Sequence, residues 1–231
     1  MSSDTSTPYF TLHESAQDPD ADIWFVEPAG FTAIPLDVFL APQDSPATDK
    51  LRNVLAPLLD AAPDGTAARQ QLFAQLSAGQ QILAALCQAG TVHCSVGLHR
   101  DDDVGGTGGP LLLSLLTLSW RDIVLAPPAI TAARAVASSD GHTHVEYVEL
   151  PCGPASVSET VRTPSLGSGL PQQPLLQIHA HLPHPAGRRL AILTLTTAEV
   201  ARREHYRAIL GQVAELVSFD DPLADVIPRP A

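Results

Sequence analysis

The chain has 231 residues, of which 45% are hydrophobic and 5% aromatic, and its 13 basic and 25 acidic side chains give a formal net charge of −12. This hydrophobic fraction predicts a folded core, which leucine, valine and alanine must largely fill because aromatic residues are scarce. The acidic balance argues against binding to nucleic acid or to an anionic membrane surface, because both depend on clustered Lys and Arg.

Cysteine usage and hydropathy indicate the compartment. Cys87, Cys94 and Cys152 form no Cys-x-x-Cys pair, and three cysteines in a chain of this length are not typical of a disulfide framework. The N-terminus has no basic region followed by an apolar run, and no stretch reaches about 18 uninterrupted apolar residues. The sequence therefore predicts a soluble, cytoplasmic protein that does not span a membrane.

The chain divides into an arm, a domain and a tail. Residues 1–22 are polar and are expected to form a flexible acidic arm, followed by a single α+β domain at 23–219 and a polar tail at 220–231. No Lys or Arg precedes Lys50. The acids of the arm, among them Asp18, Asp20 and Asp22, form either a solvated face or a docking surface for a basic partner.

Hydrophobic periodicity predicts the elements of the domain in chain order. The short connections between strand-like runs favour antiparallel neighbours, so we expect a mostly antiparallel central sheet of about seven or eight strands flanked by about four helices. The predicted strands are 23–26, 31–36, 91–98, 111–120, 142–150, 155–162, 175–182 and 190–195, and the predicted helices are 51–59, 66–88, 127–138 and 196–219.

The last hairpin and helix carry the clearest pattern. Alternation in 175–182 predicts one apolar face, formed by Leu176, Ile178, Ala180 and Leu182. The run 190–195 is apolar on both faces, which predicts a central strand. Thr196 and Glu199 have the spacing of a capping box at the start of the helix. The expected buried positions of that helix are Tyr206, Ile209, Leu210, Val213, Leu216 and Val217.

Histidine spacing raises the question of a metal site. His142 and His144 share one face of a predicted strand, and so do His179 and His181. If these strands were neighbours, four imidazoles would converge on zinc, nickel or copper. The alternative is that all four are partly exposed sheet histidines, and this is the interpretation that we adopt, with no metal and no cofactor assigned.

The other candidate motifs for metal binding, phosphate binding or catalysis are incomplete. The run Asp18-x-Asp20-x-Asp22 resembles the start of a calcium loop, but the later ligand positions do not follow. The aspartate- and glycine-rich loop 101–109 contains neither a P-loop nor a dinucleotide turn, and 167–169 is not a nucleophile elbow. Cys94 follows His93 in a strand, where neighbours point to opposite faces. We assign no catalytic residue.

Arginines are concentrated near the C-terminal helix. Five of the 13 basic residues lie within 20 positions. One interpretation is a solvated helix face, and the other is a patch that binds the acidic arm or an acidic partner. The candidate partner-binding residues are Arg188, Arg202, Arg203 and Arg207 on this patch and Asp18, Asp20 and Asp22 on the arm.

Three stretches carry a resemblance to a known group. Gly30-Phe31-Thr32-Ala33-Ile34-Pro35-Leu36, the run from Pro183 to Leu190 and the run from Leu193 to Thr196 resemble those of bacterial proteins from high-GC genomes whose expected fold is PsbP-like. The resemblance covers residues 22–221 and implies a central antiparallel sheet between helical layers, an α/β/α sandwich. It also implies an accessory or adaptor role without enzyme activity, and it carries over no site residue.

The sequence favours a non-enzymatic accessory or adaptor protein that acts through an unidentified protein partner. Its polar residues are expected to be too scattered to form a reaction centre. Two alternatives stay open: a metal-binding protein or metal-dependent enzyme that uses the strand histidines, and a carrier of a small ligand. The oligomeric state is open as well, a homo-oligomer included.

Overall fold

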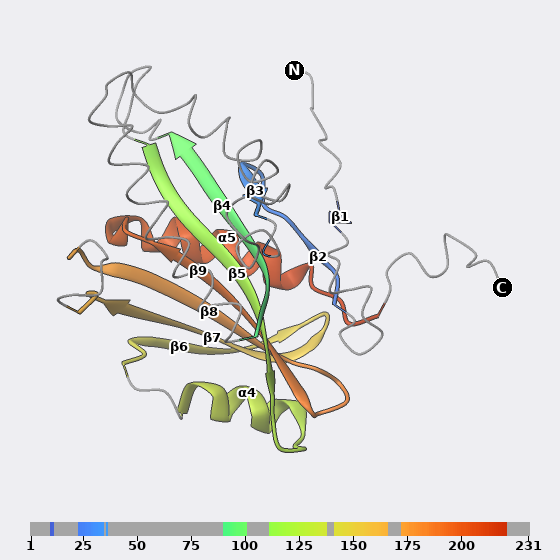
Figure 1. Cartoon of the computed structure of the whole chain (residues 1–231). Coiled ribbons are helices and arrows are strands. Elements are labelled where there is room, and N and C mark those ends of the chain that lie inside the picture. The colour runs from blue at the N-terminus through green and yellow to red at the C-terminus, as the bar shows by residue number, and fades with distance from the viewer. Residues whose placement is uncertain are drawn as a thin grey trace, which may run out of the picture.

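The fold is seen in a computed structural model that describes residues 10–11, 23–34, 36, 90–100, 111–137, 141–165 and 172–220. Figure 1 shows the arrangement of these residues. The helices predicted at 51–59 and 66–88, the acidic arm apart from 10–11, and most of the polar tail lie outside the described residues.

A seven-stranded antiparallel sheet in the order β3-β4-β5-β9-β8-β7-β6 organises the described chain, beside a two-stranded sheet of β1 and β2. The fold class is therefore α+β with an antiparallel sheet, as the sequence predicted. The strands are β1 (Phe10–Thr11), β2 (Phe25–Val26), β3 (Phe31–Ala33), β4 (Thr91–Arg100), β5 (Leu111–Asp122), β6 (His144–Leu150), β7 (Gly153–Arg162), β8 (Leu175–Pro183) and β9 (Arg189–Thr197).

Strand β9 lies at the centre of the sheet, between β5 and β8. Its Leu193 and Leu195 pair with Ala180 and Ile178 of β8, and all four side chains are buried. The predicted apolar face of β8 and the central position of β9 are both confirmed. Burying these aliphatic side chains against a helix supplies the core, at roughly 2–3 kcal/mol for each fully buried leucine or isoleucine.

Two α-helices of the described chain pack on the sheet. Helix α4 (Pro128–Ala137) lies against β7 and β8, where the Ser156 hydroxyl donates a 2.8 Å hydrogen bond to the Ala132 carbonyl. Helix α5 (Arg203–Glu215) lies against β8 and β9. Figure 1 shows the two helices on opposite sides of the sheet. Neither combines the length with the apolar character that crossing a lipid bilayer would require.

The predicted start of the last helix is wrong. Thr196 and Thr197 still pair within β9, and the Thr197 hydroxyl accepts a 3.2 Å hydrogen bond from the Glu199 N–H. A short 3-10 turn, η2 (Val200–Arg202), then leads into α5. These two threonines therefore extend the strand instead of starting the helix as the capping-box pattern predicted. Each of them has a cross-strand partner on both sides.

Two further predictions need correction. Leu216 was expected to be buried, but it follows the end of α5 and is 46% exposed. His142 was expected to begin a strand, but β6 begins at His144. Gly141 has a φ of 90°, and the Thr143 N–H bonds to the Glu159 carbonyl, so His142 lies in the turn that leads into the strand.

Candidate functional site

Three histidines meet on the face of the sheet opposite the leucine core. His179 and His181 alternate with the buried apolar residues of β8, so both point to the same face. His142 reaches them from the turn before β6. The ring centroids are 5.8 Å apart for His142 and His179, 6.2 Å for His142 and His181, and 5.9 Å for His179 and His181.

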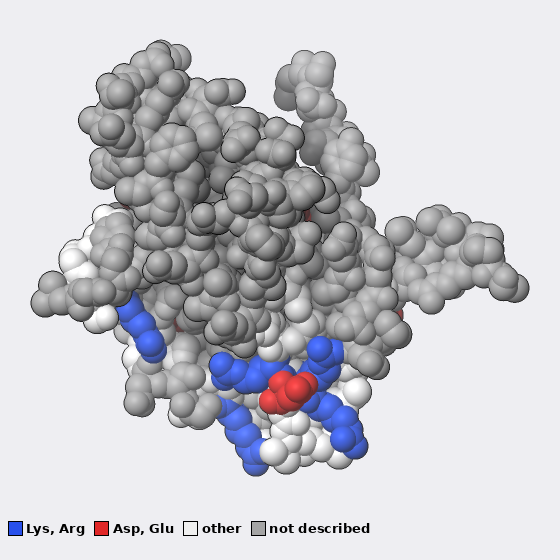
Figure 2. All heavy atoms as spheres, viewed as in Figure 1, with Lys and Arg blue, Asp and Glu red and all other residues white. Residues whose placement is uncertain are grey.

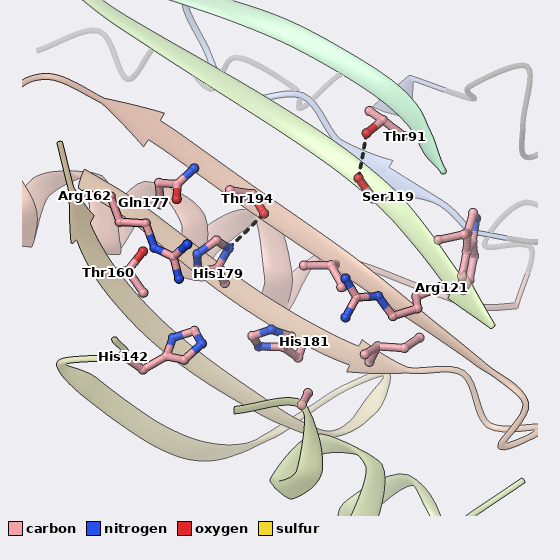
Figure 3. Close-up of a pocket in the computed structure, with 14 residues that line it drawn as sticks. Thr91, Ser119, Arg121, His142, Thr160, Arg162, Gln177, His179, His181 and Thr194 are labelled. Carbon is pink, nitrogen blue, oxygen red and sulfur yellow. Dashed lines mark hydrogen bonds between the residues drawn. The ribbon is translucent and has the colours of Figure 1, made fainter. Parts of the chain in front are cut away.

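These histidines line a cavity of about 270 Å³, which we call the polar hollow. Figure 3 shows Arg162 and Arg121 toward its two ends, with the histidines between them. Hydroxyl and amide side chains and a few apolar ones complete the wall. The described lining residues are Thr91, Ser119, Trp120, Arg121, Ala135, His142, Thr160, Arg162, Gln177, His179, His181, Leu190, Ile192 and Thr194.

The environment of the polar hollow keeps its imidazoles neutral. Burial, together with the charges of His181, His142 and Arg162, lowers the pKa of His179 to about 3. Burial and the charge of His142 lower the pKa of His181 to about 4. Burial and Arg162 also lower the pKa of His142. At neutral pH the three rings are therefore hydrogen-bonding groups without charge, and the positive charge of the hollow belongs to its two arginines.

Several polar atoms in the polar hollow are buried without a hydrogen-bond partner. Nδ1 of His181 and the hydroxyl of Thr160 have none, and these side chains are only 6% and 2% exposed. Nδ1 of His142 is in the same state. By contrast, Nδ1 of His179 lies 3.0 Å from the Thr194 hydroxyl. A buried polar group without a partner costs roughly 1–3 kcal/mol, so this surface is suited to a ligand that would satisfy it.

The histidine set that the sequence singled out is brought together in part. His142, His179 and His181 converge, whereas His144 pairs with Glu146 at 2.7 Å on an exposed part of β6. Strands β6 and β8 are not neighbours, because β7 lies between them. Within the described ranges, no group of three or more His, Cys, Asp or Glu residues is placed to hold a metal ion.

The expectation that polar residues are scattered is wrong for this face. Three imidazoles and two guanidinium groups share one hollow. The sequence gives no reason to select Arg121 or Arg162, because each stands at or near the end of its own strand with no motif around it. The available signal was the run of polar residues at alternate positions of β7 and β8, which marks a face that is not packed against core.

The arginines proposed for partner binding have different surroundings. Arg207 binds Glu159 at 2.8 Å and Arg203 binds it at 3.3 Å, and Glu159 is only 3% exposed. Burial lowers the pKa of Arg207, but the hydrogen bond and charge of Glu159 outweigh it and the net pKa is raised. Two of the four candidate arginines thus hold a buried carboxylate of the same chain, while Arg188 is exposed. Asp18, Asp20 and Asp22 lie outside the described residues, and binding of an acidic partner stays a prediction.

Replacing Arg207 with methionine should destabilise the fold by about 2–3 kcal/mol. The change leaves the buried Glu159 carboxylate with the longer ion pair to Arg203, and breaking a buried pair from one side is costly. Denaturant unfolding at neutral pH measures the loss. The control Arg188→Met removes an exposed guanidinium and should change the free energy of unfolding by less than about 0.5 kcal/mol. Equal losses in both variants would contradict the role given to Glu159.

The cysteine and its neighbouring histidine point apart, as their positions in one strand predicted. Cys94 is fully buried. His93 lies on the other face of β4, 3.1 Å from the Glu27 carboxylate and edge-on to the ring of Phe25. The loop 101–109 and the segment 167–169 lie outside the described residues, so the structure says nothing about them.

Comparison of the chain with models of protein families, with curated proteins and with solved structures found no match in any of the three. The polar hollow itself is therefore the basis for assigning a function.

Proposed function

We propose that this protein binds a small anionic ligand in the polar hollow. The observation that carries the proposal is the joint placement of Arg121 and Arg162 with three imidazoles around one cavity, in a chain whose net charge is −12. In an acidic protein, a local basic cavity attracts anions and holds them by charge-assisted hydrogen bonds. Figure 2 shows more basic than acidic side chains on the described surface of this view.

An anion fits this environment better than a metal cation. The described lining residues include no carboxylate or thiol. Both guanidinium groups would repel a cation, because Arg162 acts electrostatically on His142 and His179, and Arg121 acts on His181. An anion would instead accept hydrogen bonds from arginine N–H groups, from imidazole N–H groups and from the unsatisfied Thr160 hydroxyl.

The proposed role is binding or carriage rather than catalysis. Within the described part of the hollow, the Thr194 hydroxyl and His179 form a pair, but no carboxylate stands behind the imidazole to orient it. The Ser119 hydroxyl interacts with the Thr91 hydroxyl at 2.9 Å and not with a histidine. Activation of a hydroxyl as a nucleophile usually depends on such a base and on a third group that orients it.

Calorimetric titration with inorganic phosphate and with short carboxylates should give saturable binding by the wild-type chain. Replacing Arg162 with glutamine should weaken the affinity about tenfold, equivalent to about 1.4 kcal/mol, because a charge-assisted hydrogen bond is lost. Arg188→Gln removes an exposed arginine outside the hollow and should leave binding unchanged. Absence of binding by the wild type, or an equal loss in both variants, would reject the proposal.

A second candidate is the accessory or adaptor role that the PsbP-like resemblance implies, with helical layers on both faces of the sheet. The location in the cytoplasm is proposed separately, from cysteine usage and hydropathy. Its structural support is the segment between β5 and α4, where Val124 is 86% exposed and Leu125 62% exposed. Exposed neighbouring apolar side chains are a common feature of protein contact sites. A Val124→Glu/Leu125→Glu variant should lose any protein partner that the wild type retains in an affinity pull-down, and retention of that partner would reject this role for the segment.

A further inference from the structure

We infer that the ligand of the polar hollow is an elongated molecule with an acidic group at each end and an apolar spacer between them. This inference rests on the proposed anion-binding function and specifies its ligand class. Three features carry it: the placement of the two arginines on either side of the histidines (Figure 3), the grouping of each with its own set of hydrogen-bonding groups, and the apolar side chains that line the same hollow.

The first acidic group would lie at the Arg162 end. Arg162 ends β7 and pairs in register with Leu175, the first residue of β8. Thr160 and Gln177 pair two residues further along the same two strands, and both line the polar hollow. The Thr160 hydroxyl is buried without a hydrogen-bond partner. Figure 3 shows Arg162, Thr160 and Gln177 grouped at this end, next to His179.

The second acidic group would lie at the Arg121 end. Arg121 pairs with Leu190 on β9, and the adjacent pair of lining residues is Ser119 with Ile192. Ile192 in turn pairs with His181, whose buried Nδ1 has no hydrogen-bond partner. Figure 3 shows the Arg121 side chain extending toward His181. Each end of the hollow thus combines one guanidinium with one buried polar atom that lacks a partner.

The placement of the two arginines on either side of the histidine pair (Figure 3) favours an extended ligand over one compact anion. His179 and His181 are successive residues on one face of β8, and such residues are roughly 7 Å apart. Arg162 acts on His179 and Arg121 acts on His181, so the two guanidinium groups flank this pair from opposite sides. A ligand that contacts both arginines must therefore extend past both imidazole rings (Figure 3), whose centroids are 5.9 Å apart.

Apolar side chains in the wall of the hollow suit a hydrocarbon spacer. Ile192 on β9 and Ala135 on α4 line the hollow, together with Leu190. Methylene groups placed against these side chains would lose contact with water, at roughly 0.8 kcal/mol for each buried CH₂. A linear α,ω-dicarboxylate has this form, and a sugar or polyol with a phosphate at each end shares its charge pattern.

Calorimetric titration of the full chain at pH 7 with succinate, adipate, suberate, hexanoate and fructose 1,6-bisphosphate tests the inference. We expect adipate or suberate to bind at least about tenfold more tightly than hexanoate and than succinate, because only the longer dianions reach both arginines. Arg121→Gln and Arg162→Gln should each remove this advantage, while Arg188→Gln should keep it. Thermal melting of each variant shows whether it is folded.

The outcomes separate this inference from the proposed function. If hexanoate binds as tightly as adipate and suberate, or if only one arginine affects the dianions, the two-ended ligand is rejected while anion binding stands. If phosphate and every organic acid fail to bind, both are rejected. Tighter binding of the bisphosphate than of any dicarboxylate, with equal sensitivity to both arginines, supports two acidic ends and identifies them as phosphates, but it rejects the apolar spacer.

Discussion

Acidification from pH 6.5 to pH 4.5 should destabilise this protein by roughly 2–4 kcal/mol through two histidines alone. In the unfolded chain, His179 and His181 take up protons near their ordinary pKa of 6.5, whereas folding lowers the two pKa values to about 3 and about 4. Between these values the unfolded state binds more protons than the folded state. Stability therefore falls as the pH falls through this window, by up to roughly 1 kcal/mol per pH unit for each histidine.

Denaturant unfolding at pH 7.5, 6.5, 5.5 and 4.5 measures this dependence. A His179→Gln/His181→Gln variant is the reference, because the carboxylates elsewhere in the chain titrate in both proteins and their effect cancels in the difference. The free energy of unfolding of the wild type should fall more steeply with acidification than that of the variant. Parallel curves would show that the two imidazoles titrate normally in the folded protein.

Nuclear magnetic resonance gives a readout that does not depend on the stability of the variant. Of the nine histidines, we expect the resonances of His179 and His181 to stay at their neutral positions at pH 5. A bound anion should move both titrations toward higher pH, because a negative charge beside an imidazole favours its protonated form. Titration of both rings near pH 6.5 in the free protein would contradict the burial that the structure assigns to them.

The sequence was sufficient to predict the strands of the seven-stranded sheet, apart from their exact bounds, and the apolar face of that sheet. Polar residues alternate in β8 with Leu176, Ile178, Ala180 and Leu182. Only a strand that turns these four apolar side chains toward the core accounts for this alternation. The run 190–195, apolar at every position except Thr194, could only be a central strand. These features follow from local pattern, and the structure confirms them.

The site could not be predicted in the same way, because it depends on pairing between distant strands. Arg162 and Arg121 reach one hollow only because β9 and β8 lie between β5 and β7, and nothing near either arginine specifies that order. From the sequence, His142 and His144 were expected on one strand face. His142 instead lies in the turn before β6 and lines the polar hollow, whereas His144 lies within β6 and contacts Glu146.

The polar face of the sheet also explains why the sequence favoured partly exposed sheet histidines over a binding site. Alternate positions with histidine, serine and threonine are typical of a strand that faces water. Here the same pattern lines a partly enclosed cavity, because α4 packs over β7 and β8 and removes part of that face from solvent. Ser156 and Ser158 are both buried on this side. The candidate binding site therefore results from the burial of these polar side chains under α4, and the residue types alone do not predict it.

Replacing Leu210 with alanine should cost about 2–5 kcal/mol of stability, which is comparable to the whole effect of acidification. Leu210 lies on the side of α5 that faces β8 and β9, is 1% exposed, and belongs to the main core cluster with Leu193 and Leu195. Truncation removes buried methyl groups and leaves a cavity that the rigid sheet beneath cannot fill, so the transfer and cavity costs add.

Leu216→Ala is the matched control, because it deletes the same atoms six residues along the chain at a position that is 46% exposed. We expect this variant to lose less than about 0.5 kcal/mol, since the side chain is already largely hydrated. Denaturant unfolding of both variants at neutral pH gives the comparison. Equal losses would show that α5 does not present Leu210 to the sheet. Because α5 packs on the face opposite the polar hollow, a folded Leu210→Ala protein should still bind phosphate with wild-type affinity, which separates the support of the sheet from the chemistry of its polar face.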